Sequence, residues 1–193
     1  MQIIRHAAFV ATPWKNGGGI THEAIRVPPQ GDAFRWRMSV AHIGQSGPFS
    51  EFAAYQRIMV LLRGNGVALT FADGKARALR AVGELVEFDG AIQTECELLD
   101  GDCVDLNLMV AKALPRAEAS VRLIEGRVDI ARSSGRSVVI FPLDARIELD
   151  DGAGAATLEP WDLAVSAGPV STEARMSIEA RPAARVFIAS VAD

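Results

Sequence analysis

The first segment whose residues could do chemistry is a run of glycines beside a cation. It comprises Trp14, Lys15, Asn16, Gly17–Gly19, Thr21 and Glu23. Consecutive glycines allow positive φ angles and a close approach to a ligand, and their N–H groups could form an anion-binding nest to which Lys15 adds charge. The same residues are also typical of a tight hairpin with Asn-Gly in its turn. The run is not a phosphate loop, because it lacks the Gly-Lys-Ser/Thr sequence.

Two later segments alternate polar and apolar residues. In Arg35–Ala41 an extended strand would place Arg35, Arg37 and Ser39 opposite Trp36, Met38 and Val40. In Val104–Met109 it would place Asp105, Asn107 and Met109 opposite Leu106 and Leu108. Each segment could be a half-exposed strand with its polar face in water. Alternatively, the polar faces line the mouth of a barrel, where a buried Arg37 or Asp105 would need a partner or a ligand.

Residues 51–58, which follow Ser50 and include Arg57, fit either a short helix or a loop. We expect Ser50 to cap such a helix, with a ligand contact as the alternative role. Arg57 could bind a carboxylate through two N–H groups, or it could pair with a surface acid.

The histidines do not form the ligand set of a mononuclear metal site. His6, His22 and His42 never occur as His-x-His, and none lies in the second half of the chain. We therefore expect no metal site and no cofactor. A covalent nucleophile is not indicated either, because Gly-x-Ser-x-Gly is absent. Acid–base catalysis by Glu23 or Asp105 remains open.

Composition indicates an ordinary globular protein. The 193 residues are 49% apolar and 23% charged, and the formal net charge of −4 comes without a Lys/Arg run. This argues against nucleic acid or an anionic membrane surface as partners. No apolar run reaches the ~18 residues of a membrane span, and the first residues do not resemble a signal peptide. We expect a cytoplasmic protein in which Cys96 and Cys103 are free, structural thiols.

The apolar pattern predicts an all-β fold. Short strand-like runs such as Val60–Leu62, Val67–Phe71 and Val138–Ile140 are separated by turns rich in Gly, Asp and Pro, as in sandwiches and barrels.

The chain also contains an internal repeat. A gapless shift of 78 residues superposes Val60 on Val138, Leu69 on Ile147, Asp73-Gly74 on Asp151-Gly152, Leu85 on Leu163 and Gly90 on Gly168. A chance match between strand-rich halves is the alternative, but the agreement of turn residues and apolar phase favours a duplication.

The repeat and the lapse of alternation at Ala113–Arg116 predict two lobes. Residues 1–116 form an N-terminal lobe with the candidate site, and residues 117–193 form a smaller C-terminal lobe. Residues 1–52 and Val104–Met109 have no counterpart in the second half, so any site belongs to the first lobe.

Taken in their order along the chain, several motifs of this sequence resemble those of the HutD/Ves family. They are Trp14–Gly19 with Thr21 and Glu23, Trp36–Ala41, Gly47–Ser50, Arg57, the Gly64 turn, Phe88–Gly90, Cys96 and Asp105–Met109. Ala53–Gln56 departs from the family pattern, which has a Gly and an acidic residue before the arginine. The resemblance implies a bicupin, with two RmlC-like β-barrel or jelly-roll lobes. Family members are associated with histidine utilisation, and the family has no firmly assigned reaction.

The resemblance and the cationic residues together predict a metal-independent binder of a small carboxylate of histidine catabolism, formylglutamate or urocanate, in a regulatory or buffering role. The expected ligand-binding residues are Trp14, Lys15, Asn16, Gly17, Thr21, Arg37, Ser39, Ser50, Arg57, Asp105, Asn107 and Met109. A metal-free isomerase or amide hydrolase using Glu23 or Asp105 is one alternative. A structural or partner-binding module is another, and a homodimer is compatible with the fold.

Overall fold

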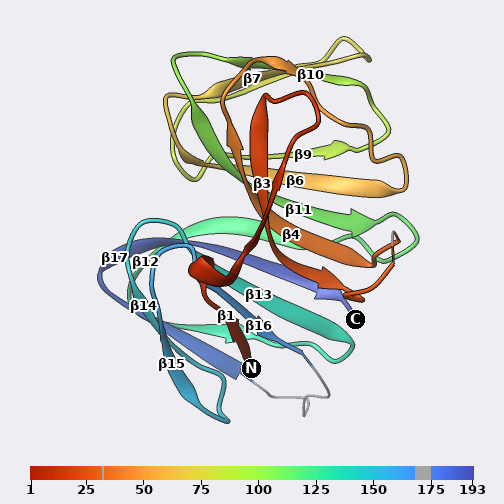
Figure 1. Cartoon of the computed structure of the whole chain (residues 1–193). Coiled ribbons are helices and arrows are strands. Elements are labelled where there is room, and N and C mark those ends of the chain that lie inside the picture. Colours follow the sequence, from red (N-terminus) through yellow and green to blue (C-terminus); the bar gives the residue numbers. More distant parts are fainter. Residues whose placement is uncertain (32, 168–174) are drawn as a thin grey trace. The chain divides into compact units, whose positions relative to one another are not determined.

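Strands make up nearly all regular structure in the computed structural model, which describes residues 1–31, 33–167 and 175–193 (Figure 1). The strands are β1 (Gln2–Ile4), β2 (Val10–Pro13), β3 (Gly19–Val27), β4 (Trp36–Ile43), β5 (Gly47–Pro48), β6 (Tyr55–Arg63), β7 (Val67–Phe71), β8 (Ala76–Leu79), β9 (Leu85–Asp89), β10 (Thr94–Leu98), β11 (Cys103–Ala111), β12 (Glu118–Ala131), β13 (Arg136–Pro142), β14 (Ile147–Asp150), β15 (Ala155–Leu158), β16 (Leu163–Ser166) and β17 (Arg175–Ala192). A single 3-10 turn, η1 (His6–Ala8), is the one helical element of the described ranges. The all-β prediction is confirmed. None of the described residues forms a helix with the length and apolarity needed to cross a membrane.

The described chain divides into two compact units. The N-terminal unit is Phe9–Leu114, and the C-terminal unit combines Met1–Ala8 with Pro115–Asp193. The first residues belong to the C-terminal unit because β1 pairs antiparallel with β16, with Gln2 opposite Val165. The predicted first lobe, 1–116, included these residues, since nothing in the sequence signals pairing over so long a separation.

The N-terminal unit consists of two sheets around one core. A six-stranded sheet has the order β2-β3-β4-β11-β6-β9, and a four-stranded sheet has the order β5-β10-β7-β8. Core residues come from both sheets: Ile43, Met59, Leu61, Val86, Phe88 and Cys103 from the first, and Val67, Leu69, Phe71, Leu79 and Cys96 from the second. Both cysteines are therefore free thiols inside an apolar core.

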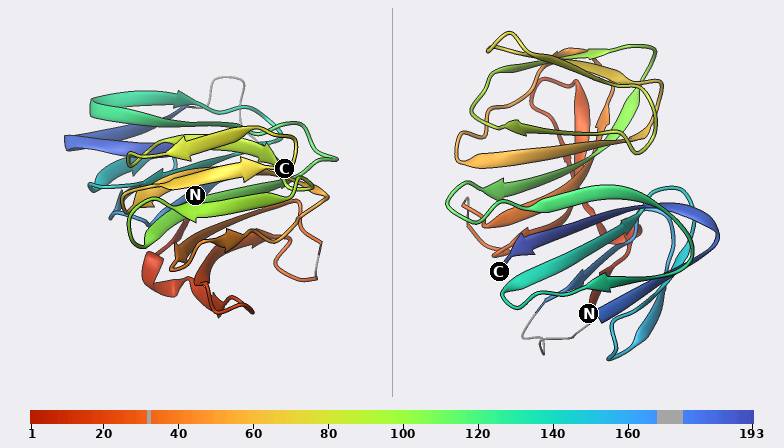
Figure 2. Two further views of the ribbon diagram at one scale, coloured as in Figure 1. Left: turned by 90° about the horizontal axis from the view of Figure 1, so that it is seen from above. Right: turned by 180° about the vertical axis from the view of Figure 1, so that it is seen from behind.

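The C-terminal unit is one seven-stranded sheet of order β1-β16-β13-β17-β14-β15, with β12 beside β17. The long strands β12 and β17 pair from Glu118 opposite Ser190 to Ala131 opposite Arg175, with a register shift between Ile124 and Gly126 (Figure 2). The hydrophobic core cluster of this unit includes Val138 and Ile140 of β13.

The same strand order occurs in both units. The N-terminal unit contains the orders β4-β11-β6-β9 and β5-β10-β7-β8. In the C-terminal unit the first half of β12 pairs with the second half of β17, which pairs with β13, and β13 pairs with β16. The second half of β12 pairs with the first half of β17, followed by β14 and β15. The strands β12 and β17 of the C-terminal unit thus each take the place of two separate strands of the N-terminal unit.

The gapless shift of 78 residues is wrong in detail. Met59 and Leu61 face the core of the N-terminal unit, so the neighbouring Val60 points to the opposite face of β6. Val138 packs inside the core of the C-terminal unit, so superposing Val60 on Val138 exchanges the two faces of the strand. The superposition of Leu69 on Ile147 does keep both residues in their cores.

The repeated Asp-Gly pairs do occupy corresponding hairpins. Gly74 lies between β7 and β8 with φ 84°, and Gly152 lies between β14 and β15 with φ 82°. Both values favour glycine. The shift also places Leu85 on Leu163, three residues from the position that pairing gives: Val60 pairs with Leu85, whereas Val138 pairs with Ser166. Gly168, the predicted counterpart of Gly90, lies outside the described residues.

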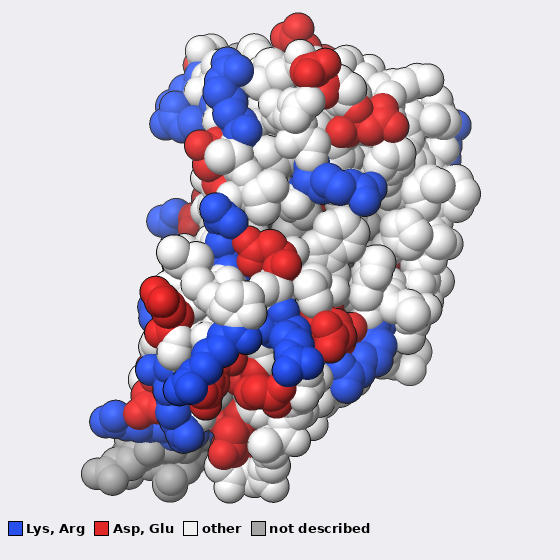
Figure 3. All heavy atoms as spheres, turned by 90° about the vertical axis from the view of Figure 1, so that its left-hand side faces the viewer, with Lys and Arg blue, Asp and Glu red and all other residues white. Residues whose placement is uncertain are grey.

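Charged side chains of both signs are interspersed on the face of the molecule shown in Figure 3. Among the described residues visible there, no extended basic stripe of the kind that binds nucleic acid is formed.

Candidate functional site

The polar residues predicted on β11 and β6 face the core of the N-terminal unit. Cys103 of β11 and Met59 of β6 belong to that core. Side chains alternate along a strand, so Asp105 and Asn107 share the face of Cys103, and Arg57 shares the face of Met59.

The polar side of β4 faces the same way. Ile43 is part of the core, and Arg37 and Ser39 share its face by alternation. The opposite face of β4, with Trp36 and Met38, is buried as well. The half-exposed alternative for these strands is therefore wrong, because Ser39 and Asp105 are each only 2% exposed.

Cross-strand pairing arranges these residues in three rows. The arginine row is Arg26, Arg37, Met109, Arg57 and Phe88, each opposite the next. The second row is Glu23, Ser39, Asn107, Met59 and Val86. The third row is Thr21, Ala41, Asp105 and Leu61. Opposite residues in a sheet have Cβ atoms roughly 5 Å apart, so side chains from five strands converge on one face.

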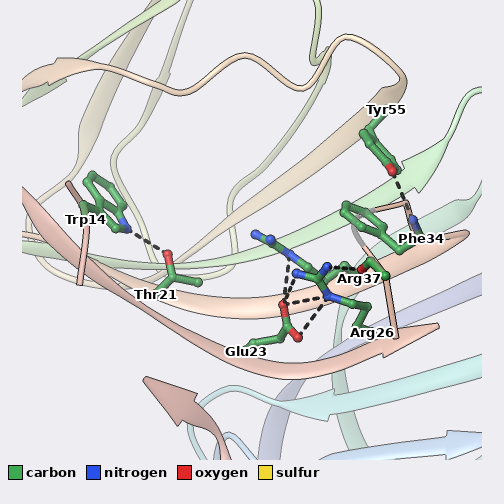
Figure 4. A network of polar contacts seen from close by, with 8 residues as sticks. Trp14, Thr21, Glu23, Arg26, Phe34, Arg37 and Tyr55 are labelled. Atoms are coloured by element: carbon green, nitrogen blue, oxygen red, sulfur yellow. Dashed lines mark hydrogen bonds and ion pairs between the residues drawn. The ribbon is translucent and has the colours of Figure 1, made fainter. Parts of the chain in front are cut away.

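A register shift in β3 adds a carboxylate and a third arginine to this face. The pairing of β3 with β4 shifts between Glu23 and Ile25, and such a bulge re-aims the side chains around it. Glu23 accepts a hydrogen bond from Arg26 Nη2 at 3.0 Å and lies 3.7 Å from Nε of Arg37 (Figure 4). Glu23, a candidate catalytic base, is thus held by two cations.

Aromatic rings cover the guanidinium groups. The Cζ atom of Arg57 lies 4.9 Å from the ring centroid of Phe88, 5.2 Å from that of Phe49 and 5.7 Å from that of Phe52. The Cζ atom of Arg37 lies 5.5 Å from the Phe34 ring centroid and 5.6 Å from that of Phe52. Cation–π contacts of this kind are favourable by about 0.5–2 kcal/mol, and they leave the hydrogen-bonding edges of the arginines available.

Four buried polar atoms on this face have no hydrogen-bond partner among the described residues. They are Nε of Arg37, Nε of Arg57, Oδ2 of Asp105 and Oδ1 of Asn107. We call these four residues the buried polar quartet. A buried polar atom without a partner costs about 1–3 kcal/mol, so the quartet disfavours folding unless something binds it.

Burial also shifts the pKa values of the three ionisable residues of the quartet, Arg37, Arg57 and Asp105. Burial raises the pKa of Asp105 to about 7, although the charge of Arg57 and a hydrogen bond from Asn107 lower it. Burial lowers the pKa of Arg57 to about 10, against the charge of Asp105, which raises it. Burial likewise lowers the pKa of Arg37, opposed by Glu23. Asp105 can therefore gain or lose a proton near neutral pH, which fits either anion binding or proton transfer.

The four-stranded sheet places the thiol of Cys96, on β10, in the same core. Burial raises the pKa of Cys96 to about 12, and the charge of Asp105 raises it further. Cys96 therefore stays protonated at neutral pH and supplies no charge to the quartet.

The glycine run forms the tight hairpin between β2 and β3. The Gly17 N–H donates to the carbonyl of Trp14 at 3.0 Å, and the Gly18 N–H donates to Oδ1 of Asn16 at 3.1 Å. These two N–H groups are therefore not available as a nest for an anion. Lys15, Asn16 and Gly17 are exposed, and the structure does not bring them into the rows of the sheet.

Trp14 and Thr21 are bonded to each other. The indole N–H of Trp14 donates to Oγ1 of Thr21 at 2.8 Å (Figure 4). The Trp14 ring packs against the core beside Phe49. A Cβ atom at Gly19 would lie 3.1 Å from the Trp14 ring and 2.4 Å from the carbonyl oxygen of His42. Glycine is required there because the ring and a backbone occupy that space.

Ser50 does not cap a helix. The chain from Ser50 to Ala54 contains no helical residue, and β6 begins at Tyr55. The role of Ser50 at the site is through its backbone, because its carbonyl accepts a hydrogen bond of 3.4 Å from Nη1 of Arg57.

The aromatic residues and Arg26 are the part of this cluster that the sequence did not reveal. They are Arg26, Phe34, Phe49, Phe52 and Phe88. Arg26 reaches the site only through the bulge in β3. The phenylalanines come from loops and an edge strand, where no alternation pattern marks their direction.

A separate pocket of about 250 Å³ lies at the edges of both sheets. It is lined by Gln56, Phe71, Asp73, Lys75, Arg77, Glu87, Phe88, Asp89 and Ile92. None of the predicted site residues lines it. It shares with the arginine row only the side chain of Phe88.

Within the described residues, His, Cys, Asp and Glu nowhere form a group of three or more that could hold a metal ion. His42 instead pairs with Asp102, Nε2 to Oδ2, at 3.2 Å.

Comparison with known proteins identifies relatives across most of the chain. The family model described as HutD matches residues 6–187. An uncharacterised 21.2 kDa protein from the hutC 3' region of Pseudomonas putida is 37% identical over 150 residues, 77% of each chain. Protein Ves of Citrobacter koseri is 31% identical over 139 residues, 72% of this chain and 70% of the relative.

Solved structures agree with these relatives. A conserved Pseudomonas aeruginosa protein of unknown function superposes with a TM-score of 0.92 at 30% identity, over 100% of this chain and 98% of the other. HutD from Pseudomonas fluorescens gives a TM-score of 0.84 at 28% identity, with coverage of 99% and 97%. A cupin 2 conserved barrel domain protein from Leptotrichia buccalis gives 0.61 at 10% identity, with coverage of 100% and 96%, which shows a cupin-like fold.

Proposed function

The chain belongs to the HutD family, and from this premise we propose that it is a bicupin that binds a small carboxylate without a metal ion. The binding groups are the arginines of the buried polar quartet, and the bound molecule is an intermediate of histidine catabolism.

The bicupin interpretation is supported by the repeated strand order. Each unit contains the same two runs of four neighbouring strands or half-strands. Two units of independent origin would not be expected to share this strand order. We infer a duplication in which the second copy fused separate strands into β12 and β17.

The observation that carries carboxylate binding is that the Nε atoms of Arg37 and Arg57 make no hydrogen bond, although Nε of Arg37 lies 3.7 Å from the Glu23 carboxylate. A guanidinium group donates along its edge, in geometry that matches a planar carboxylate. The ring faces of Phe52 and Phe88 occupy the other approach to these groups. A carboxylate would satisfy both donors and reduce the penalty of burying two positive charges.

The link to histidine catabolism comes from the relatives. One is named for the hutC 3' region and another is HutD. Formylglutamate and urocanate are carboxylates of that pathway, and binding them would let the protein buffer or report their concentration.

A metal-free enzyme is the second candidate, favoured by one observation. Asp105 has a pKa raised to about 7 by burial, which suits a group that accepts and releases protons at physiological pH. In that case formylglutamate or urocanate would be consumed on long incubation with concentrated protein, which NMR would detect.

Calorimetry tests the binding proposal. Titrations with formylglutamate, urocanate, glutamate and histidine should give heat for at least one carboxylate, and Arg57→Met should weaken that binding strongly. Arg80→Met is the matched control, since Arg80 is an exposed arginine of the same unit, and it should bind as the unaltered protein does. Absence of heat and of any thermal shift at millimolar ligand would refute the proposal.

A further inference from the structure

The acceptor half of the buried polar quartet carries an inference about the class of ligand. We propose that the site takes a carboxylate that also bears an N–H or O–H donor, and that Asp105 and Asn107 select the ligand by that donor. This rests on the proposed function, because it assigns the other end of the same bound molecule.

The unpartnered atoms of the quartet are of two opposite kinds. Arg37 and Arg57 each have an Nε donor without a hydrogen bond, that of Arg37 being 3.7 Å from Glu23, whereas Asp105 and Asn107 each have an oxygen acceptor without one. An anion alone could satisfy the two donors but would face the two acceptors with more lone pairs. A molecule that satisfies all four must carry acceptors at one end and a donor at the other.

The two kinds of atom lie in an order along the sheet. The arginines stand in the arginine row, Asn107 in the second row and Asp105 in the third. Successive residues on one face of a strand are roughly 6.8 Å apart along its axis. A carboxylate between the arginines would thus direct the rest of the molecule, with its donor, along the sheet toward Asn107 first and Asp105 beyond it. N-acylated amino acids, free amino acids and imidazole-bearing acids have this layout.

The side chains of Asp105 and Asn107 and the nearby arginines do not satisfy every acceptor oxygen of the quartet. Asn107 donates to the Asp105 carboxylate and so lowers its pKa, yet Oδ2 of Asp105 and Oδ1 of Asn107 remain without a donor. Asp105 is 2% exposed and Asn107 6% exposed, so an analogue lacking the donor would leave both oxygens buried and unpaired. Sites of this construction reject such analogues strongly.

A matched series of ligands tests the inference by calorimetry at pH 8, where Asp105 is ionised. The probes are N-acetylglutamate, its N-methyl derivative, and 2-acetoxyglutarate, in which oxygen replaces the N–H. The unaltered protein should bind N-acetylglutamate about 10- to 100-fold more tightly than either analogue, the equivalent of leaving buried acceptors unpaired.

Two substitutions assign the selectivity to residues. Asp105→Asn and Asn107→Leu should each reduce the ratio of affinities at least severalfold while carboxylate binding persists, and Asn107→Leu guards against a folding defect in the first variant. Glu97→Gln is the matched control, because it makes the same acid-to-amide change at an exposed position of β10, and it should keep the ratio. Equal binding of all three probes by the unaltered protein would overturn the inference but leave carboxylate binding standing. An unchanged ratio in both variants would also overturn it, whereas no binding of any carboxylate would defeat the proposed function itself.

Discussion

Two arginines on equivalent strands show how the two units differ. Arg57 of β6 and Arg136 of β13 both lie on the core-facing side of their strand. Nε of Arg136 donates to Oγ of Ser190 at 2.7 Å, and its Nη2 donates to the Ser190 carbonyl at 2.7 Å. Nε of Arg57 has no partner among the described residues. The fold thus satisfies the Nε donor of Arg136, whereas the Nε donor of Arg57 has no hydrogen bond within the fold.

The interiors repeat this difference on a larger scale. The C-terminal unit also buries polar side chains, but these are bonded within the fold: Oδ1 of Asp151 accepts from the Gly154 N–H at 3.1 Å, and Oδ2 of Asp162 accepts from Nη1 of Arg5 at 2.6 Å. The N-terminal unit buries the carboxylate of Asp105, the amide of Asn107 and the guanidinium of Arg57 beside the half-buried Arg37, at positions where apolar side chains would pack at lower cost. Among the described residues, the buried side-chain atoms that the fold leaves without a hydrogen bond therefore lie in the N-terminal unit.

The largest expected effect contrasts the two arginines directly. Arg57→Met should weaken carboxylate binding about 30-fold or more, because it removes a buried charge-assisted contact of about 2 kcal/mol or greater. Arg136→Met should leave binding intact but lower the melting temperature by roughly 2–10 °C, because it breaks hydrogen bonds of about 1–3 kcal/mol. Calorimetry and thermal melts on both variants measure this. The reverse pattern, with Arg136 needed for binding, would break the contrast between the units.

The pH dependence should come next in size. Asp105 is neutral below its pKa of about 7, so its negative charge opposes an anionic ligand only at higher pH. Affinity for a simple carboxylate such as succinate should fall about three- to tenfold from pH 6 to pH 8. Arg57, with a pKa of about 10, keeps its charge across this range, and Cys96 stays neutral. Asp105→Asn should flatten the profile, and a profile that stays steep in this variant would point to another group.

The ionisation of Asp105 also affects the free energy of unfolding. Its pH dependence has the opposite sign to that of an ordinary salt-bridged carboxylate. The folded-state pKa of Asp105 is raised from 3.8 to about 7, so the folded state binds more protons than the unfolded state between these values. The free energy of unfolding should therefore fall as pH rises from about 4 to 7. Urea unfolding across this range, compared with Asp105→Asn, would show a smaller slope in the variant if Asp105 is the cause.

A smaller effect is expected from the ring shared by both arginines. Phe52 lies 5.6 Å from Cζ of Arg37 and 5.7 Å from Cζ of Arg57. Phe52→Leu keeps an apolar side chain but removes the ring, so carboxylate affinity should fall about two- to fivefold, in line with a cation–π contact at a partly exposed site. A loss as large as that of Arg57→Met would mean that Phe52 contacts the ligand itself.

The smallest effect is expected at the exposed hairpin. Lys15 stands in the turn after Trp14 and outside the rows of the sheet. Lys15→Ala should change carboxylate affinity by less than about twofold, as expected of a screened surface charge. A tenfold loss would restore the glycine run as part of the site.

Much of the polar face could be predicted from the sequence. Alternation alone placed Arg37 with Ser39 and Asp105 with Asn107, and the register of β4 against β11 joins these pairs. The choice between a wet and a buried face could not be predicted. Both faces of these strands are buried, and an alternating pattern with Ser, Arg and Asp on one side is the usual sign of exposure.

The remaining features depend on contacts that local sequence does not encode. Arg26 joins the site only because β3 shifts register near Glu23. The gapless repeat failed at Val60 and Val138 because an insertion of odd length between strands reverses which side chains face the core. The pairing of β1 with β16 joins residues at opposite ends of the chain, where only the folded structure reveals the partner.

The most direct test is a crystal structure of the protein soaked in a small carboxylate such as formylglutamate. We predict that its carboxylate oxygens lie within hydrogen-bond distance of Nε of both Arg37 and Arg57, with the rest of the molecule directed toward Asn107 and Asp105. A saturating soak in which these four side chains bond only to one another or to water, or in which the carboxylate occupies a different place, would contradict the account.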